Sequence, residues 1–573
     1  MDSNGRSIWF PTLEKILQFL TYREYRNSIN WYYNLTFDVE SVLKMLPETE
    51  LSEIIEDNKT TYKDFKITYL PHKYFKIASS HKHSVEFFDI AQFYDTSLNN
   101  ASKEYLNDEK DDIEIKGIME YVEYPEVQNT ISKYCKQDCI LTRKLAELLH
   151  QGVKDCKIPF CKPYSKAALA ETAFLQACDI PQYLDAPKMV NKFAYWSYYG
   201  GWFELFKRGY QDDYIAEYDI NSAYPYAMIN QPDFRGMHWE TVQKQSKDAA
   251  LGFYLVSLKP KTHGYISPLQ IRTESLSVHP ESNTVKYVND VEIDMLKDTF
   301  HVKIIKGYEG FIDHPVYPLR EFVLKLYADK SKYKNKSKMM YSVVKITLNG
   351  AYGKFIQRTG GKIGNMFNPI YASRITASCR KQIWDAVKNN QRDVIGIQTD
   401  SCIMQKDIDL DVGTELGQWS KKTYDKGLFL ISGVYEMLGD TKKTKIRGFD
   451  TKMPLMDTLL KYPNDNTIKI TKEKPLHLKP CYRSRTRSVS ETNKFVNDVK
   501  TLSCKYDLKR NWTEEPEDWR EFCRNQWDSE PLRIEYTPIH ESEYQAMNRK
   551  IMEGYIDNSH DNESKVLIGN YSK

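Results

Sequence analysis

Two aspartates stand in short polar strings that are far apart in the sequence. Asp219 opens the string DINSAYP (219–225), and Asp400 lies in the string IQTDS (397–401). Between them, the string KITLNGAYG (345–353) carries a lysine and a tyrosine seven positions apart. Two aspartates from separate strands can hold a pair of divalent ions, and such a pair catalyses phosphoryl and nucleotidyl transfer. Because both ligands are hard oxygens, magnesium is the expected ion.

The three strings, in this order and at these separations, resemble motifs A, B and C of family B DNA polymerases. The string YYGG (198–201), just ahead of the first aspartate, narrows the resemblance to the protein-primed branch found in phages, archaeal viruses and linear plasmids. The resemblance implies an α+β multidomain fold, a right-hand polymerase of palm, fingers and thumb that follows an N-terminal ribonuclease H-like exonuclease-type domain. It also implies template-directed DNA synthesis with two Mg²⁺ ions, for which Mn²⁺ can substitute. The implied partners are primer–template DNA, deoxynucleoside triphosphates and a separate terminal protein that provides the first hydroxyl.

The resemblance also assigns a nucleotide site. It makes Asp219, Asp400 and the carbonyl of Ile220 the metal ligands. Tyr224 becomes the steric gate, an aromatic ring that leaves no room for a 2′-hydroxyl, and Lys345 neutralises triphosphate charge. Nucleotide contacts are expected from Ile220, Asn221, Ser222, Tyr224, Lys334, Lys345, Asn349 and Tyr352.

The stretch 321–355 has helical character and repeated lysines. Lys345, Asn349 and Tyr352 fall at positions i, i+4 and i+7, which predicts that they share one helix face. In the related polymerases this helix belongs to the fingers, and Tyr352 would pack against the nascent base pair. Lys334 is the candidate for a second phosphate contact, with a solvated lysine-rich face as the alternative.

The expected DNA contacts come from three further strings. In YYGG, the two glycines permit close approach of another backbone. The string TASCR (376–380) resembles a Thr-x-x-Gly-Arg element, with Cys379 in place of the glycine and Arg380 available for a DNA phosphate. The string GVYEM (433–437) stands where relatives carry Lys-x-Tyr, so Lys445 is expected to supply the missing cation. The predicted DNA-binding residues are Tyr198, Gly200, Gly201, Arg380, Tyr435 and Lys445.

Two features depart from the family pattern. Gln398 stands where relatives have the first aspartate of an Asp-Thr-Asp-Ser motif, which lowers the local negative charge by one. The interval between Tyr352 and Thr376 is short, although the family's second insertion, a β-hairpin that encircles DNA, normally occupies it. High intrinsic processivity is therefore not predicted.

The N-terminal third carries a second set of candidate residues. The string YNLTFD predicts a strand end that presents Asn34 and Asp38, followed by a helix. Residues 133–149 predict an amphipathic helix with Tyr134 and Asp138 one turn apart. These elements resemble the second and third exonuclease motifs of DNA polymerases.

The first exonuclease motif, an Asp-x-Glu pair on a strand, is not found ahead of Asn34. Asp38 and Glu40 have that spacing, but the helix predicted after them favours the second-motif interpretation. Too few carboxylates then remain for two metal ions, so a 3′–5′ exonuclease is left open. A start codon assigned too far downstream would explain this, as would an exonuclease fold kept for packing or strand binding. Asp89 and Asp95 are expected to be solvent-facing loop residues.

The resemblance divides the chain into six parts. They are an exonuclease-like domain (1–160), a first palm part with the YYGG string (166–259), an insertion of the terminal-protein-region type (260–320), fingers (321–368), a second palm part (369–450), and a thumb and C-terminal region (451–573).

Composition sets only broad limits. With 573 residues the chain is too long for one compact core. Because 81 Lys and Arg oppose 78 Asp and Glu, DNA binding would require basic residues gathered on one surface. The cysteines form no CxxC pair, so reduced thiols are expected rather than a zinc site. No apolar run is long enough for a membrane span and no signal pattern is present, so we expect a protein of the host-cell cytoplasm without a membrane partner.

Two other function classes stay open. A nuclease or repair enzyme would rely on Asp38 and Asp138, and Asp219→Ala would leave its main activity intact. A non-catalytic replication factor would bind primer–template DNA without extending it. Magnesium-dependent primer extension, compared with that of Asp400→Ala, separates the three classes.

Overall fold

The computed structural model describes residues 1–557 except 10, 80–82, 111–120, 122, 161, 274–275, 360–361, 450–452, 506 and 535–549. The chain forms two compact units, which we describe separately. Unit 1 contains Met1–Gln176, Ala328–Gly350 and Thr471–Asp498, and unit 2 contains Ala177–Tyr327, Ala351–Ile470 and the chain from Val499 onward. Three elements pass between the units, namely α12 (Arg320–Tyr333), β23 (Thr467–Pro475) and β24 (Phe495–Ser503).

Unit 1 is built on a five-stranded sheet with the order β1-β5-β4-β3-β2, in which β1 and β5 run parallel and the other neighbours run antiparallel. The strands are β1 (Asn30–Tyr32), β2 (Lys59–Tyr62), β3 (Phe65–Leu70), β4 (Tyr74–Ser79) and β5 (Ser84–Asp89). In β3, Phe65, Ile67 and Tyr69 are buried in alternation, as expected of a strand with one face on the core.

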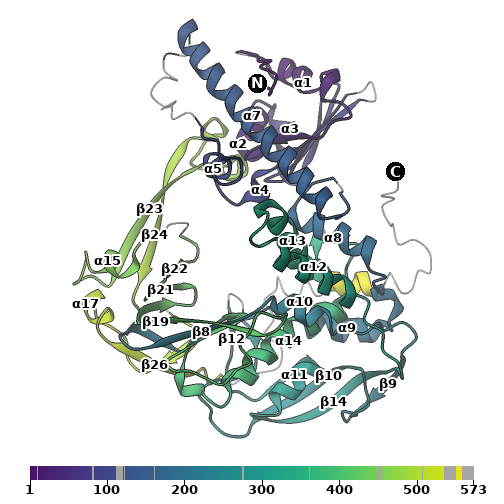
Figure 1. Cartoon of the computed structure of the whole chain (residues 1–573), viewed down its shortest axis with the longest axis vertical. Coiled ribbons are helices and arrows are strands. Elements are labelled where there is room, and N and C mark those ends of the chain that lie inside the picture. Colours follow the sequence, from purple (N-terminus) through teal and green to yellow (C-terminus); the bar gives the residue numbers. More distant parts are fainter. Residues whose placement is uncertain are drawn as a thin grey trace. The chain divides into compact units, whose positions relative to one another are not determined.

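Unit 1 also contains the following helices. They are α1 (Leu13–Leu20), η1 (Arg23–Tyr25), α2 (Leu35–Leu43), α3 (Glu48–Asp57), α4 (Ala91–Tyr94), α5 (Leu98–Leu106), α7 (Pro125–Asp155), α8 (Lys166–Ala177), α13 (Lys338–Gly350), α16 (Leu478–Arg483) and η6 (Val489–Glu491). Leu35, Val39 and Leu43 recur at the spacing of one helix face and bury α2 against the sheet. Helix α7 begins with Pro125 at its first turn and packs against β1, α5 and α13 (Figure 1).

Unit 2 contains three larger sheets. Their orders are β19-β8-β18-β17-β6, β22-β21-β20-β7-β26-β25 and β13-β10-β14-β9. The strands are β6 (Trp202–Leu205), β7 (Lys207–Gln211), β8 (Ile215–Ile220), β9 (His238–Val242), β10 (Leu251–Pro260), β11 (Ile271–Arg272), β12 (Ser277–Val278), β13 (Thr284–Asn289), β14 (Phe300–Phe311), β15 (Arg358–Thr359), β16 (Lys362–Ile363), β17 (Val394–Thr399), β18 (Ser401–Met404), β19 (Trp419–Tyr424), β20 (Lys426–Ile431), β21 (Val434–Leu438), β22 (Lys442–Ile446), β25 (Arg510–Trp512) and β26 (Gln526–Pro531).

The helices of unit 2 are η3 (Tyr183–Asp185), α9 (Lys188–Trp196), α10 (Ala223–Met228), α11 (Asp290–Leu296), η4 (Tyr352–Ile356), α14 (Pro369–Val387), η5 (Gln391–Asp393), α15 (Leu455–Leu459) and α17 (Trp519–Phe522). Helix α14 is capped by Asn368, whose side chain accepts a hydrogen bond from the N–H of Tyr371, and it is buried along most of its length. The interval of the short second insertion holds η4 and the two-residue strands β15 and β16.

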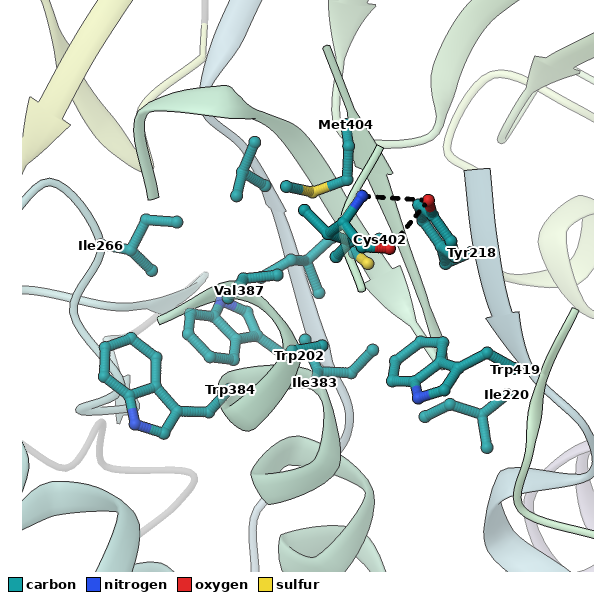
Figure 2. Packing of buried hydrophobic residues seen from close by; sticks show 14 of the residues in the cluster. Trp202, Tyr218, Ile220, Ile266, Ile383, Trp384, Val387, Cys402, Met404 and Trp419 are labelled. Atoms are coloured by element: carbon teal, nitrogen blue, oxygen red, sulfur yellow. Dashed lines mark hydrogen bonds between the residues drawn. The ribbon is translucent and has the colours of Figure 1, made fainter. Parts of the chain in front are cut away.

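A shared core joins α14 to the sheet that contains β8. Figure 2 shows Trp202, Trp384 and Trp419 packing with Ile220 and Cys402, which come from strands and a helix far apart in the sequence. Because this core is buried on the sheet's inner face, it fixes the strand ends that carry the two aspartates. None of the helices in the described part of the chain has both the length and the apolar character needed to cross a bilayer.

Candidate active site

Asp219 and Asp400 lie side by side in unit 2, Asp219 on β8 and Asp400 between β17 and the neighbouring strand β18. Asp219 is in β8, where it pairs with Ser401 of β18, and Asp400 is the residue just before Ser401. The N–H of Ile220 donates a 2.9 Å hydrogen bond to the carbonyl of Asp400. The Asp400 charge contributes to a raised pKa of Asp219, so the two carboxyl groups are close enough to interact. The structure thus brings together the two aspartates that the sequence placed in separate strings.

The backbone beside each aspartate is in an uncommon conformation. Thr399, just before Asp400, has a φ of 70°, and Ser222, at the N-terminus of α10, has a φ of 56°. A β-branched residue such as threonine rarely adopts this left-handed region, and strained backbone of this kind clusters at functional sites. Both residues lie at or just after the ends of the strands, where the chain changes direction next to the carboxylates.

Both carboxyl groups have raised pKa values. The surrounding protein limits hydration of Asp219, and repulsion from Asp400 adds to this, so its pKa rises to about 6. Limited hydration also raises the pKa of Asp400, while the cations of Lys445 and Lys443 oppose the rise. None of the described side chains donates a hydrogen bond to either carboxylate. Two close carboxylates that receive no side-chain hydrogen bond are an environment that a cation would stabilise.

The donor set at this point consists of oxygens. Within the described ranges, no cluster of three or more His, Cys, Asp or Glu side chains is arranged to hold a metal ion. Asp219 and Asp400 would therefore share their ions with backbone carbonyls, water or a bound phosphate, as hard divalent cations commonly do. The residues present fit such ions, because the pair is acidic, partly open to solvent and only partly offset by the cations of Lys443 and Lys445.

Glu217 is a third acidic residue near the pair that the sequence analysis did not single out. It lies two positions before Asp219 on β8, it is buried, and its charge adds to the raised pKa values of both aspartates. Its carboxylate bonds to the ammonium of Lys443 and accepts a 3.2 Å hydrogen bond from the hydroxyl of Tyr424. Strand alternation could have found it, because residues i and i+2 face the same side.

The residues just after Asp219 are held by backbone contacts. Both the backbone and the side chain of Asn221 are already hydrogen-bonded. Its N–H donates to the carbonyl of Gln418 and its side-chain amide donates to the carbonyl of Gly413, each at 2.9 Å. Ile220 is buried, so only its backbone is available to a ligand. The predicted nucleotide contacts of Ile220, Asn221 and Ser222 stay predictions.

The expected steric gate and the tyrosine of the middle string are in direct contact. The rings of Tyr224 and Tyr352 stack with centroids 3.9 Å apart and planes 19° apart. The charge of Asp400 acts on both hydroxyl groups, which places the stacked pair beside the carboxylates. This contact links the string around Asp219 with the middle string.

The middle string is not one continuous α-helix. Helix α13 ends at Gly350, and Tyr352 begins the 3₁₀ helix η4. The prediction that Tyr352 shares a helix face with Lys345 and Asn349 is therefore wrong, because the helix ends before it reaches Tyr352. Lys345 and Asn349 are both exposed on α13 in unit 1, as is Lys334 in the turn before α13, so their roles stay predictions.

The predicted DNA contact of Arg380 is contradicted by its burial. Arg380 lies in α14 with 0% of its surface exposed, and its guanidinium donates to the carbonyls of Tyr199 and Gly200 at 2.9 and 2.6 Å. The TASCR string is therefore internal and anchors the YYGG loop instead of meeting DNA. Tyr198 and Gly201 are partly exposed in that loop, where a DNA contact stays a prediction.

The predicted DNA contact of Tyr435 is wrong for the same reason. Tyr435 is fully buried in β21 and stacks on Phe429, with ring centroids 5.7 Å apart. Lys445, its cross-strand neighbour on β22, is exposed and close enough to lower the pKa of Asp400. The predicted DNA contact of Lys445 stays a prediction. Gln398 is buried, and its amide has no hydrogen-bond partner among the described residues.

The exonuclease-like residues of unit 1 also come together, although not as predicted in detail. Strand β1 ends at Tyr32, and Asp38 lies inside helix α2, so the prediction that a strand end delivers Asp38 is wrong. Asn34 is the left-handed residue at the start of that helix, with a φ of 64°. Limited hydration raises the pKa of Asp38 to about 7, and the Asp138 carboxylate is among the charges that contribute.

Tyr134 and Asp138 lie one turn apart on α7, as predicted. The ammonium of Lys110 is 2.8 Å from Asp138 Oδ2 and 4.2 Å from the centroid of the Tyr134 ring. Burial raises the pKa of Asp138 by more than the Lys110 cation lowers it. This acidic pair therefore already contains a cation supplied by the protein.

Asp89 and Glu40 are structural residues. Asp89 is buried, and its carboxylate accepts hydrogen bonds from the N–H groups of Asn34 and Leu35 at 3.0 and 3.1 Å, so it caps α2. The expectation of a solvent-facing Asp89 is therefore wrong. Glu40 is buried too, and it accepts a 3.0 Å hydrogen bond from the N–H of Leu478. It cannot pair with Asp38 as an Asp-x-Glu metal motif on a strand.

The fold and the two acidic pairs together define a class of protein. Residues 108–366 match the family model described as DNA polymerase type B, organellar and viral. The predicted α+β right-hand fold, with palm, fingers and thumb after an exonuclease-type domain, is confirmed by its match to solved polymerase structures. The predicted resemblance to family B DNA polymerases is confirmed as well, because the chain is similar to organellar and viral type B enzymes.

Particular relatives make the comparison concrete. A DNA polymerase of Acidianus bottle-shaped virus (isolate Italy/Pozzuoli) is 24% identical over 418 residues, which is 66% of this chain and 61% of that protein. The match thus spans about three-fifths of the length of this curated relative. Among solved structures, phi29 DNA polymerase complexed with single-stranded DNA aligns with a TM-score of 0.60 and 16% identity, covering 86% of this chain and 93% of that chain. The phi29 ternary complex with primer–template DNA and incoming nucleotide substrates aligns over the same shares at 16% identity, with a TM-score of 0.61.

Proposed function

We propose that this chain is a template-directed DNA polymerase that adds deoxynucleotides to a primer hydroxyl. The observation that carries the proposal is the convergence of Asp219 and Asp400 on adjacent strands, beside the stacked rings of Tyr224 and Tyr352. The related type B enzymes of viruses support it, as do the phi29 structures that contain primer–template DNA and nucleotides.

Type B DNA polymerases generally use divalent metal ions. We propose two Mg²⁺ ions here, replaceable by Mn²⁺, held by Asp219, Asp400 and the carbonyl of Ile220. Such ions supply activation of the attacking hydroxyl and neutralisation of the charge that develops on the leaving phosphate. Because the pKa of Asp219 is about 6, this carboxylate is largely ionised at pH 7 to 8, and below that range protons compete with metal cations for it.

The other residues of unit 2 orient the substrate. The Tyr224 ring is proposed to lie under the incoming sugar and to exclude a 2′-hydroxyl, while Tyr352 supports the ring by stacking on it. Lys445 would place a cation near the primer end. In unit 1, the exposed Lys345 is proposed to bind the triphosphate, with Asn349 and Lys334 as further contacts.

Primer extension on a template with Mg²⁺ tests the polymerase proposal. We expect extension by the wild type and none by Asp400→Ala. Asp393→Ala is the matched control, because Asp393 precedes the other end of β17, where it pairs with Lys406 at 2.7 Å. A wild type that binds primer–template DNA without extending it would instead favour a non-catalytic factor. Activity that survives Asp219→Ala but not Asp138→Ala would favour a nuclease, which the comparisons do not support.

A finer part of the proposal is that the first primer is a hydroxyl of a separate terminal protein. The YYGG string and the insertion at 260–320 support it, because together they resemble the protein-primed branch. Incubation with a labelled deoxynucleoside triphosphate and virion extract should yield a labelled protein that survives denaturation. The label should be lost after protease treatment and absent with Asp400→Ala. Extension of DNA primers without such an adduct would remove this part of the proposal alone.

A further inference from the structure

The YYGG loop of unit 2 is anchored from beneath by a buried arginine. Arg380 is wholly enclosed in α14, and one of its terminal nitrogens, Nη1, donates to the carbonyls of both Tyr199 and Gly200. Its Nε and Nη2 have no hydrogen-bond partner among the described residues. A buried guanidinium with free donors is costly, so these two carbonyls are its main hydrogen-bond compensation.

A carboxylate of the neighbouring helix balances this charge. Glu292 of α11 is fully buried, with its Oε1 atom 3.7 Å from Arg380 Nη2 and 2.5 Å from Lys286 Nζ. Lys286 Nζ is also 4.0 Å from the centroid of the Tyr199 ring. Burial lowers the pKa of Lys286 to about 8, and Glu292 opposes that shift. Two cations and one anion thus lie under the loop, all out of contact with solvent.

A third cation holds the loop from its other end. Arg272 Nη2 donates a 3.0 Å hydrogen bond to the carbonyl of Tyr198, and its guanidinium carbon is 4.8 Å from the Tyr199 ring centroid. Arg272, Lys286 and Glu292 all come from the stretch 260–320 that the sequence analysis treated as an insertion. The insertion therefore contributes the side chains that fix the loop.

The opposite side of the loop touches the proposed active site. A methyl group added to Gly201 would lie 2.6 Å from the Thr399 Cγ2 atom and 3.0 Å from the Tyr224 hydroxyl. The loop backbone is thus in close contact with the steric gate and with the strained residue that precedes Asp400. A shift of the loop by a few tenths of an ångström would change the support of both groups, because packed interiors tolerate little displacement.

We propose that Arg380 and Glu292 are positioning residues for sugar selection. They hold the YYGG loop in the position in which Gly201 packs close to Tyr224. In this way they set how closely the Tyr224 ring approaches the sugar of the incoming nucleotide. This inference rests on the proposed polymerase function. It assigns the arginine of the TASCR string a role inside the protein.

Single-nucleotide incorporation tests the inference through the ratio of kcat/KM for a deoxynucleotide to that for the matching ribonucleotide. We expect Arg380→Ala to lower this ratio at least tenfold, mainly by improving the relative use of the ribonucleotide, and Arg380→Lys to restore part of it. Tyr224→Ala sets the loss that follows when the gate itself is removed. An unchanged ratio in Arg380→Ala would overturn the inference.

Arg374→Ala is the matched control for general damage to α14. Arg374 is also buried in this helix and pairs with Asp290 of α11 and with Gln231, but it has no contact with the loop. We expect a comparable loss of thermal stability and an unchanged sugar ratio. If Arg374→Ala lowers the ratio as much as Arg380→Ala does, the effect is structural and the inference fails.

Hydrogen exchange provides a readout that does not depend on catalysis. In peptides that cover residues 197–206, Arg380→Ala should speed amide exchange and Arg374→Ala should not. This result would support the anchor even if the wild type extended no primer, a failure that would fall on the proposed function alone. Where Arg380→Ala does not fold, Glu292→Gln carries the test, since it removes the balancing charge with little change of shape. An extending Glu292→Gln variant with wild-type exchange and sugar ratio would overturn the inference.

Discussion

The two acidic pairs of this molecule differ in how their charge is balanced. In unit 2, Asp219 and Asp400 receive no hydrogen bond from any described side chain. In unit 1, Asp38 and Asp138 are also close enough to interact, but Lys110 forms an ion pair with Asp138 at 2.8 Å. The pair in unit 1 has a lysine ammonium in direct contact with one carboxylate, whereas the cations of Lys443 and Lys445 only offset part of the charge of the pair in unit 2.

This difference has a chemical consequence. An ammonium group neutralises a carboxylate, but it cannot act as a Lewis acid or lower the pKa of a coordinated water as a divalent ion does. Two other acidic residues near Asp38 already accept hydrogen bonds from the backbone. Glu40 accepts one from the N–H of Leu478, and Asp89 accepts two from the N–H groups at the start of α2. The pair in unit 2 is thus the better candidate for metal-dependent chemistry, and the following experiments test that asymmetry.

The largest expected effect is on catalysis. Asp219→Asn should lower the primer-extension rate about a thousandfold or more, because several kcal/mol of metal-based stabilisation would be lost. The double variant Asp38→Asn, Asp138→Asn should extend primers at a rate within about twofold of wild type. Single-turnover extension with Mg²⁺ measures both. Comparable losses in the two variants would break the contrast between the pairs.

The second effect is on stabilisation by metal. Mn²⁺ at about a hundred times its dissociation constant should stabilise the metal-binding form by about 2.7 kcal/mol, which appears as a rise in Tm of several degrees. Asp400→Asn should lose most of this rise, whereas Asp138→Asn should keep it. Thermal unfolding with Mn²⁺ against a chelator at pH 8 gives the comparison. A rise that depended on Asp138 would place the ion in unit 1.

The third effect tests the built-in cation of unit 1. Lys110→Met should destabilise the protein by about 2 kcal/mol at pH 8, because it leaves a half-buried carboxylate without its counter-charge. The loss should shrink at pH 4, where Asp138 with its raised pKa takes up a proton. Lys144→Met is the matched control, since Lys144 pairs with Asp108 at the same 2.8 Å on the surface, and this substitution should cost much less stability. Equal losses from the two variants in urea unfolding would show that the Lys110 pair is an ordinary surface ion pair.

The sequence predicted the strands beside Asp219 and Asp400 better than it predicted the exonuclease-like strand. Both aspartates of unit 2 end runs of buried β-forming residues, so the strand and its end could be read locally. At Asp38 the same approach failed, although Leu35, Val39 and Leu43 recur at helical spacing. If this helical spacing had been weighted more heavily than the short run of strand-forming residues before it, Asp38 would have been placed on a helix.

Burial of polar residues was the main thing that the sequence could not supply. Arg380 lies in a helix that is covered on nearly all sides by segments from distant parts of the chain, and Tyr435 lies in a strand covered in the same way. Local periodicity reports one buried face, but it does not report how many partners surround an element. Arginine and tyrosine are usually exposed or interfacial, so both were assigned to DNA. The compensating carbonyls of Tyr199 and Gly200 lie about 180 positions away in the sequence.

The smallest expected effect is the effect of Asp219 on the stability of the folded protein, which is separate from its effect on catalysis. Its carboxyl group has a pKa of about 6 in the folded protein, above its usual value, so the folded state holds a proton that the unfolded state releases between about pH 4 and 6. Stability contributed at this position therefore falls as the pH rises through that window and stays low above it. In a chelator at pH 8, Asp219→Asn should be more stable than wild type by about 1 kcal/mol, a modest gain because water screens this partly exposed group. The gain should vanish near pH 4, where the wild-type carboxyl group is neutral too. Chemical unfolding across this pH range measures the difference. A variant that is less stable than wild type at pH 8 would show that the ionised carboxylate of Asp219 does not destabilise the folded protein.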